Sequence, residues 1–340
     1  MIRKYLKKLV VTYPKFLEHI KWLLSFKIIS HNRFYKHFTL RKALNQTTCF
    51  HNSDLIVCIE NTASCNARCV ICLHNHTEIT GSMPMPLYEK LINECVENKI
   101  KRVSFGVYGE PLADQLFIDR IQHLRSRGLE YMIISNGSLL SDELARRLFQ
   151  LGGLKEIRFS VNGFSKKMCE KVMIGLDRDT TYENILNFLK LKKLHNKADL
   201  TVNISCVKTK YIVKELDELI NFWEAQEGIG RIYLLDLIDK FGNLTNTDGI
   251  GRRGILDRDD LWFPPCNELW SYLTVYYNGK VAPCCMDNNE RILIVGDVNN
   301  QSLGEILTGE PYNALRKTHL ENQRNKHFIC KKCHYPSYWY

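Results

Sequence analysis

The chain has 340 residues, of which 45% are hydrophobic and 25% charged, the composition of a globular protein with room for one large domain and a small one. Its thirteen cysteines, an odd number, favour metal ligation in a reducing cytoplasm over a secreted disulfide framework. The net charge of +10 resides in residues 1–42, which contain eleven Lys or Arg against one acid, Glu18, so the remaining chain is electrically balanced.

Residues 1–50 form a basic N-terminal arm that interleaves Lys and Arg with large apolar residues such as Phe16, Trp22 and Phe26. Charged residues interrupt the apolar run, which is too short to cross a bilayer. A basic amphipathic helix suits an anionic membrane surface. We therefore expect a cytoplasmic protein with peripheral contact at the inner face of the membrane through residues 1–42, and no nucleic-acid partner. The alternative is a helix packed on the rest of the protein with a solvated basic face.

Residues 51–240 alternate between strand-like and helix-like segments. Apolar or β-branched runs occur at residues 55–60, 101–106, 130–134, 155–161, 200–207 and 231–237. Helix-like segments lie between them at residues 86–98, 114–127, 141–151, 181–195 and 212–225. Six alternations predict an α/β fold with a parallel sheet and right-handed crossovers. The count allows either a partial barrel or an open doubly wound sheet.

Three cysteines, Cys65, Cys69 and Cys72, follow the first predicted strand with spacings of three and two residues. Thiolates select zinc, copper(I) or iron–sulfur clusters. Three ligands on one short loop can hold three irons of a cubane and leave the fourth iron without a protein ligand. The alternative is a zinc site completed by His74 or His76.

Polar residues occupy alternate positions on two predicted strands, where a packed barrel would have Val, Ile and Leu. They are Arg158, Ser160 and Asn162 on the fourth strand, and Thr201, Asn203 and Ser205 on the fifth. If these faces point inward, the sheet encloses a ligand cavity. The alternative is that they face the helices.

The Cys65-x3-Cys69-x2-Cys72 loop after a first strand resembles the signature of the radical S-adenosylmethionine (SAM) enzymes. The resemblance implies a partial (β/α)6 parallel barrel over residues 51–240. It also implies a 4Fe-4S cluster whose open iron binds SAM, and a flavodoxin- or ferredoxin-type reductant. Reductive cleavage of SAM in this family yields a 5′-deoxyadenosyl radical that abstracts hydrogen from a substrate.

Several further segments resemble the SAM-contacting motifs of that family. Tyr108-Gly109-Glu110-Pro111 resembles its Gly-Gly-Glu-Pro motif, which receives the methionine ammonium group, although Tyr108 replaces the first glycine. The resemblance also implies SAM contacts for Ile71, Ser135, Asn136, Ser160 and Asn162, and we add Asn203 and Ser205 as candidates. Where many relatives carry an arginine for the SAM carboxylate, this chain has Met173, with Lys171 nearby.

Residues 241–340 are expected to form a linker followed by a small cysteine-rich β-hairpin and helix domain. Runs at residues 272–277 and 280–283 flank Asn278-Gly279, which predicts a type I′ hairpin. The surrounding cysteines resemble the SPASM/twitch extension, which implies a second, auxiliary 4Fe-4S cluster held by Cys266, Cys284, Cys330 and Cys333. Cys285 is the rival of Cys284, and a zinc ribbon is the alternative for the whole set.

With four thiolates the auxiliary cluster has no open iron, which favours electron transfer. We therefore expect a radical SAM oxidoreductase that dehydrogenates a sugar-like or lipid-linked small molecule. The alternatives are a radical SAM maturase that modifies a ribosomal peptide, and a zinc-stabilised nucleic-acid-binding protein without catalysis. No catalytic residue is assigned, and the candidates for a base are Lys171, Asp236 and Asp239.

Overall fold

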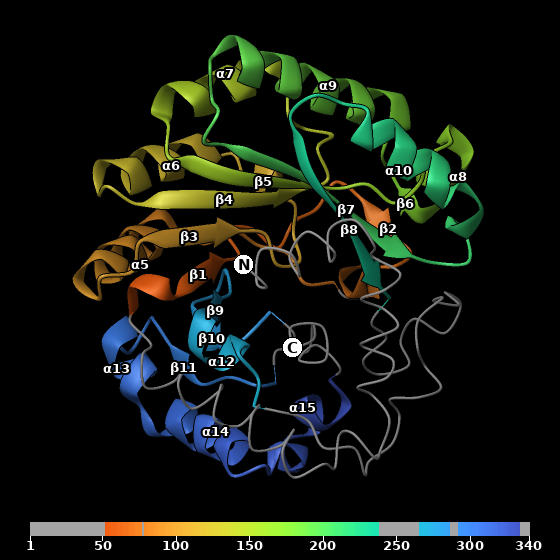
Figure 1. Cartoon of the computed structure of the whole chain (residues 1–340). Coiled ribbons are helices and arrows are strands. Elements are labelled where there is room, and N and C mark those ends of the chain that lie inside the picture. The colour runs from red at the N-terminus through yellow and green to blue at the C-terminus, as the bar shows by residue number, and fades with distance from the viewer. Residues whose placement is uncertain (1–51, 77, 238–264, 286–291, 334–340) are drawn as a thin grey trace, which may run out of the picture. The chain divides into compact units, whose positions relative to one another are not determined.

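The computed structural model describes residues 52–76, 78–237, 265–285 and 292–333 (Figure 1). The chain divides into two compact units: His51–Gly251 with Glu268–Tyr312, and Met1–Phe50 with Arg252–Asn267 and Asn313–Tyr340. The predicted N-terminal arm, most of the predicted linker and Asp239 lie outside the described residues. Within the described ranges, no helix is long and apolar enough to cross a membrane.

The first unit is built on a nine-stranded sheet with the order β11-β10-β9-β1-β3-β4-β5-β7-β8. The strands from β9 through β1 to β8 run parallel to one another, which confirms the predicted α/β fold with a parallel sheet. The sheet is open, with β11 and β8 at its edges among the described strands. Its strands are β1 Ile56–Ile59, β3 Arg102–Phe105, β4 Glu130–Ser135, β5 Leu154–Ser160, β7 Thr201–Lys208, β8 Ile229–Asp236, β9 Tyr272–Val275, β10 Lys280–Ala282 and β11 Gly296–Asp297.

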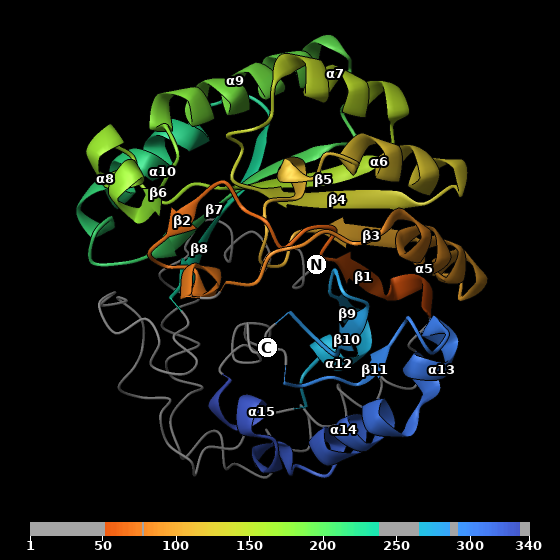
Figure 2. The same ribbon diagram turned by 180° about the vertical axis from the view of Figure 1, so that it is seen from behind.

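Helices cover one face of the parallel strands (Figures 1 and 2). The helices of the two units are α5 Met85–Glu97, α6 Phe117–Ser126, α7 Asp142–Leu151, α8 Lys166–Val172, α9 Arg178–Leu194, α10 Leu216–Glu224, α12 Glu268–Ser271, α13 Leu303–Thr308, α14 Glu310–Leu320 and α15 Phe328–Lys332. Short 3-10 helices are η1 Asn52–Asp54, η2 Leu73–His76, η3 Pro111–Ala113, η4 Val213–Glu215 and η5 Arg324–Lys326. Two further strands, β2 Arg68–Cys69 and β6 Met173–Ile174, pair separately.

The core lies between the sheet and these helices. Phe105 of β3 packs edge-on against Phe117 of α6 with ring centroids 5.4 Å apart, and Phe159 of β5 packs against Phe188 of α9 at 5.9 Å. Because alternate residues of a strand point to opposite faces, the neighbours of Phe159 in the strand direct their side chains away from the helices. This arrangement confirms that the polar face of β5 is not the helix-covered one.

The C-terminal hairpin continues the main sheet, since β9 pairs with β1 in parallel and with β10 in antiparallel orientation. The predicted type I′ turn is wrong. Tyr276 donates its N–H to Lys280 O, so the loop has three residues, and only Gly279 in it has a positive φ, of +86°. A three-residue loop places glycine after a type I turn, whereas Asn-Gly specifies type I′ only in a two-residue loop.

A buried ion pair helps to hold together the segments that follow β1 and β3. Arg120 of α6 donates through Nε to Asp114 at 2.7 Å, with both side chains almost fully buried, and also to Met83 O. Asn61, which follows β1, donates to the same Asp114 oxygen at 2.9 Å. The chain that leaves the end of β1 is thereby tied to the segment that follows β3.

Replacing Arg120 with methionine is expected to lower the free energy of unfolding by about 3–5 kcal/mol, because the carboxylate of Asp114 would stay buried without its cation. Urea unfolding of the anaerobically prepared proteins measures this change. The control is Lys193→Met, which removes an exposed pair with Glu227 and should cost less than about 1 kcal/mol. Equal losses in the two variants would contradict the role assigned to Arg120.

Candidate functional site

The cysteine loop leaves the carboxyl end of β1 and is held on both sides by backbone hydrogen bonds. Ala63 N–H donates to Gly81 O at 2.7 Å, and Val70 N–H donates to Val172 O at 2.9 Å. Cys69 lies on β2, and Cys72 closes a turn by donating its N–H to Cys69 O at 3.0 Å. Cys65, Cys69 and Cys72 are each partly exposed, so the loop presents its three thiols at an accessible surface, together with Ile71.

The three thiols influence one another electrostatically. Burial raises the pKa of Cys65 and of Cys69, and the neighbouring thiols of the loop raise both further. Three thiolates this close therefore need a positively charged partner, which the irons of a cluster supply. Among the described residues, no three His, Cys, Asp or Glu side chains lie close enough together to hold a single metal ion. A cubane binds each thiolate through a different iron, and the three-cysteine loop fits that arrangement.

Glu110 joins the ends of β3 and β4 beside this loop. Its Oε1 accepts hydrogen bonds from Ser135 Oγ at 2.7 Å and Leu112 N–H at 3.2 Å, and its Oε2 accepts from Asn136 N–H at 2.8 Å. Its own N–H donates to Ser64 O at 2.9 Å. Burial raises the pKa of Glu110, and these hydrogen bonds oppose the rise. The structure thus brings together three of the predicted SAM-contacting residues, Glu110, Ser135 and Asn136.

Gly109 is required by the close approach of two backbones. A methyl group at this position would lie 2.1 Å from the carbonyl oxygen of Thr62 and 2.8 Å from that of Ser64. The segment after β3 therefore packs directly on the residues that precede Cys65. Tyr108, at the position of the missing first glycine, has its ring 6.5 Å from that of His74, nearly parallel, just beyond Cys72.

The strand pair β2–β6 places Met173 opposite Cys69. Met173 is buried, and its sulfur lies 3.8 Å from Asn162 Nδ2, while Asn162 Oδ1 accepts a hydrogen bond from Val207 N–H at 2.8 Å. Lys171 points elsewhere, with its ammonium group 4.9 Å from the ring centre of Tyr211. Met173 therefore lies opposite Cys69 of the cysteine loop, and Lys171, the nearby cation considered for the SAM carboxylate, is directed to an aromatic ring.

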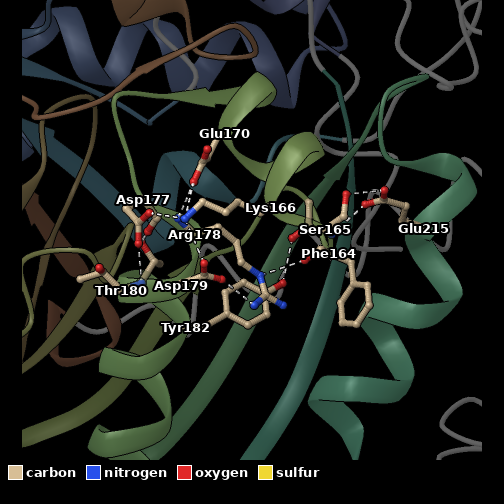
Figure 3. Close-up of polar contacts among 12 residues, drawn as sticks. Phe164, Ser165, Lys166, Glu170, Asp177, Arg178, Asp179, Thr180, Tyr182 and Glu215 are labelled. Atoms are coloured by element: carbon tan, nitrogen blue, oxygen red, sulfur yellow. Dashed lines mark hydrogen bonds and ion pairs between the residues drawn. The ribbon is translucent and has the colours of Figure 1, made fainter.

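An ion cluster closes the turn around β6 (Figure 3). Lys166, at the start of α8, binds Asp177 at 2.7 Å, Asp179 at 2.9 Å and Glu170 at 3.6 Å. The hydrogen bonds to Asp177 and Asp179 raise the pKa of Lys166, and the hydrogen bond from Lys166 lowers the pKa of Asp177. Because the residues before and after β6 are tied together, Met173 is held in register with Cys69.

Two more contacts in Figure 3 fix the ends of α8 and α9. Arg178 lies 3.8 Å over the ring centre of Tyr182 and donates to Phe164 O at 2.9 Å. Ser165 caps α8 and donates its N–H and hydroxyl to Glu215 at 2.9 and 2.6 Å. The segment that carries Met173 is thus also anchored to η4, the turn before α10.

A polar cluster lies on the face of the sheet opposite the helices. Arg158 and Glu156 of β5 form an ion pair at 2.9 Å, and Asn203 of β7 donates to the same Glu156 oxygen at 2.8 Å. The guanidinium of Arg158 also stacks 4.5 Å over the ring centre of Tyr233 on β8. Asn203 therefore belongs to this cluster, whereas Ser160 and Ser205 pair in register nearer the carboxyl ends of their strands.

The described part of the second unit holds three of the predicted auxiliary ligands, Cys266, Cys330 and Cys333. Arg324 is buried and donates to the carbonyl oxygens of both Cys330 and Cys333. His319 accepts a hydrogen bond from Cys266 N–H at 3.3 Å, and burial lowers its pKa to about 3, helped by the charges of Arg324 and His327. The predicted fourth ligand, Cys284, belongs to the other unit, and its role stays a prediction.

A largely parallel α/β sheet with a three-cysteine loop after β1, followed by a second cysteine set, is the arrangement expected of an iron–sulfur protein. The chain belongs to the radical SAM superfamily and carries a C-terminal SPASM domain: residues 59–222 match the model of the radical SAM superfamily, and residues 266–334 match that of the SPASM iron–sulfur cluster-binding domain. It is thus an enzyme whose domains imply 4Fe-4S clusters and SAM as cofactors.

This chain is similar to one curated protein and to two solved structures. A tungsten-containing aldehyde ferredoxin oxidoreductase cofactor-modifying protein from Pyrococcus furiosus is 28% identical over 320 residues, covering 82% of this chain and 85% of the relative. The structure of BtrN in complex with AdoMet and 2-DOIA is 17% identical, with a TM-score of 0.55 over 82% of this chain and 92% of BtrN. Streptococcus suis SuiB bound to SAM is 16% identical, with a TM-score of 0.62 over 95% and 83% of the two chains. At these identities the two structures establish the shared fold.

Sequence reasoning missed several residues that the structure places at these sites. Glu156 was overlooked because a carboxylate in a strand is ordinarily taken as exposed, and only its contacts with Arg158 and Asn203 reveal the cluster. His319 and Arg324 lie outside the cysteine motif. A histidine and an arginine shortly before a Cys-x2-Cys pair were the available signal, but it has no fixed spacing.

Replacing Gly109 with alanine is expected to displace the cysteine loop, because the new methyl group would overlap backbone oxygens that cannot rotate away. If each cysteine set holds one cubane, reconstituted wild-type protein carries roughly eight irons and eight sulfides, and the variant should fall toward roughly four. Iron and sulfide analysis measures the change, and the Cys65/Cys69/Cys72 triple alanine variant provides the reference.

Gly304→Ala is the matched control, because its nearest new contact is the movable side chain of Asn98, at 3.1 Å. This variant should load iron like the wild type. Full iron loading by Gly109→Ala would show that the loop tolerates the substitution and that the close packing is not needed for cluster binding.

Proposed function

We propose that this enzyme oxidises a hydroxylated small molecule, sugar-like or linked to a lipid, bound against the polar face of the sheet. When bound, the clusters and SAM would supply the radical that removes a hydrogen atom from an alcohol carbon. The substrate would then lose its hydroxyl proton to water and one electron to a cluster, so that the carbon becomes a carbonyl. A flavodoxin- or ferredoxin-type protein is the proposed source of the reducing electron. The chain's own residues bind and orient the substrate.

The cluster of Glu156, Arg158 and Asn203 carries this proposal. Among the described residues, Arg158 Nε and Asn203 Oδ1 are buried polar atoms without a hydrogen-bond partner. One is a donor and the other an acceptor, and buried polar groups in native proteins are normally satisfied. The side chains of Arg158 and Glu156 keep 28% and 19% of their surface exposed, so a ligand can reach them. The exposed parts of this guanidinium and this carboxylate are a donor and an acceptor, which suits a substrate that offers both an acceptor and a donor.

The charge of the cluster favours a neutral hydroxylated group. Arg158 and Glu156 together carry no net charge, and an anionic substrate group would meet the carboxylate of Glu156 as well as the guanidinium. A hydroxyl group donates to a carboxylate and accepts from a guanidinium at once. Vicinal hydroxyls of a sugar or cyclitol can use several such sites, which is the chemistry that this face supplies.

The relatives support a small molecule over a peptide. The Pyrococcus furiosus relative, which covers most of both chains, is named as modifying a cofactor, and the BtrN structure holds 2-DOIA. SuiB has been solved with a precursor peptide, so modification of a ribosomal peptide is the alternative for this chain. The polar cluster of Glu156, Arg158 and Asn203 favours a small molecule, because its groups and Tyr233 lie together on three adjacent strands.

Replacing Arg158 with leucine is expected to reduce substrate-dependent formation of 5′-deoxyadenosine about tenfold or more, since a hydrogen bond from a charged group is worth roughly 1.5–3 kcal/mol. Mass spectrometry of 5′-deoxyadenosine is performed with a panel of cyclitols, hexoses and lipid-linked sugars, and with synthetic peptides. Transfer of deuterium from labelled substrate to 5′-deoxyadenosine identifies the carbon attacked.

Lys155→Met is the matched control. Lys155 directly precedes Glu156 in β5, and its partly exposed side chain pairs with Asp199 and Glu130 instead of the cluster. It should keep the wild-type response, and both variants should retain wild-type iron content. Stimulation by peptides alone would overturn the proposed substrate class, and an undiminished response of Arg158→Leu would remove the cluster from substrate binding.

We also propose that residues 1–42 bring the enzyme to anionic membranes, where a lipid-linked substrate would be found. The support is the charge of this arm, with eleven basic residues against Glu18. Each Lys or Arg near such a surface contributes about 1 kcal/mol, and salt weakens the attraction.

Deleting residues 1–42 is expected to abolish sedimentation with phosphatidylserine vesicles at low salt while SAM cleavage persists. Vesicles of phosphatidylcholine alone are the control and should bind neither protein strongly. If the full-length and shortened proteins partition equally to the anionic vesicles, the arm belongs to the enzyme body instead.

A further inference from the structure

A buried histidine contacts the backbone of Cys266, one of the predicted ligands of the auxiliary cluster. His319 is near the end of α14 and is only 2% exposed. Its Nδ1 accepts a hydrogen bond from the backbone N–H of Cys266 at 3.3 Å. Both residues belong to the second compact unit, as do Cys330 and Cys333.

The hydrogen bond from Cys266 determines which ring nitrogen of His319 carries the proton. A backbone N–H can only donate, so Nδ1 must be unprotonated, and the neutral ring then carries its hydrogen on Nε2. A protonated ring nitrogen cannot ligate iron, so His319 is not a substitute for a cysteine ligand. Among the described residues, Nε2 is buried without a hydrogen-bond partner. Nε2 therefore carries a hydrogen for which the described residues supply no acceptor.

Two groups beside this imidazole are donors, the N–H of Cys266 and the guanidinium of Arg324. Arg324 directs its guanidinium to the carbonyl oxygens of Cys330 and Cys333, and so occupies the backbone acceptors of that turn. His327 is engaged with Thr318 at 3.4 Å. The acceptors that cluster binding would add to this unit are sulfurs, of the inorganic sulfides and of the cysteine thiolates.

We propose that His319 donates a hydrogen bond through Nε2 to a sulfur of the auxiliary cluster and thereby raises its reduction potential. A fully thiolate-ligated cluster is anionic and becomes more so on reduction, so a donor to sulfur stabilises the reduced form more than the oxidised form. Arg324 adds a buried positive charge with the same effect. His319 is thus a positioning and tuning residue for electron uptake. The inference concerns the cluster, and it stands independently of the proposed substrate.

The test is an anaerobic redox titration of the reconstituted full-length enzyme, followed by electron paramagnetic resonance. The Cys65/Cys69/Cys72 triple alanine variant identifies the auxiliary signal. His319→Met, which fills a similar volume without a donor, should shift the auxiliary midpoint to a more negative potential. His319→Gln can accept from Cys266 and donate from its amide, so it should return the midpoint toward the wild-type value. The midpoint of the SAM-binding cluster should not move in either variant.

An unchanged auxiliary midpoint in iron-loaded His319→Met would overturn the proposal. If that variant fails to load iron, pulsed electron paramagnetic resonance of wild-type enzyme containing 15N-labelled histidine tests for the hydrogen bond directly. A nitrogen coupling to the reduced auxiliary cluster that is lost in His319→Gln supports the hydrogen bond. Absence of such a coupling in the wild type contradicts it.

Discussion

The buried carboxylate of Glu110 is the point on which the cysteine loop and two strands converge. It accepts hydrogen bonds from Ser135 and Asn136 at the end of β4, and its backbone donates to Ser64, next to the first cysteine of the loop. Gly109 permits that contact, because any side chain there would push the backbones apart. The position of the cysteine loop relative to the sheet therefore depends on one buried acid and the glycine before it.

Around this point the chain adds supports of two kinds. The buried pair of Asp114 and Arg120 acts through desolvated charge, so removing one partner should be costly. The contacts of Lys166 near β6 are exposed, and their value lies in joining residues on both sides of a short strand. The first support holds the loop from the side of β1, and the second holds Met173 beside Cys69.

The sequence was sufficient for features that depend on local pattern. Strand and helix alternation predicted the parallel sheet because apolar runs such as that of β1 are buried by neighbouring strands whatever their partners are. The spacing of Cys65, Cys69 and Cys72 resembled a family signature, and the domains that this resemblance implied are the ones that the family models match. The turn type predicted at Asn278-Gly279 was wrong, because loop length depends on which residues pair across the loop. Glu156 and His319 were missed because their roles arise from contacts between segments distant in the chain.

The pairing of β9 with β1 affects how the chain can fold while it is being synthesised. Ile56–Ile59 is the first strand of the sheet to be synthesised, yet one of its edges is covered only when Tyr272–Val275 has emerged. Until then β1 offers a short apolar edge to any passing strand, which is a template for misassembly. Such long-range pairing also slows folding. A fragment ending near residue 240 would lack β9, the strand that covers this edge of β1 in the full chain.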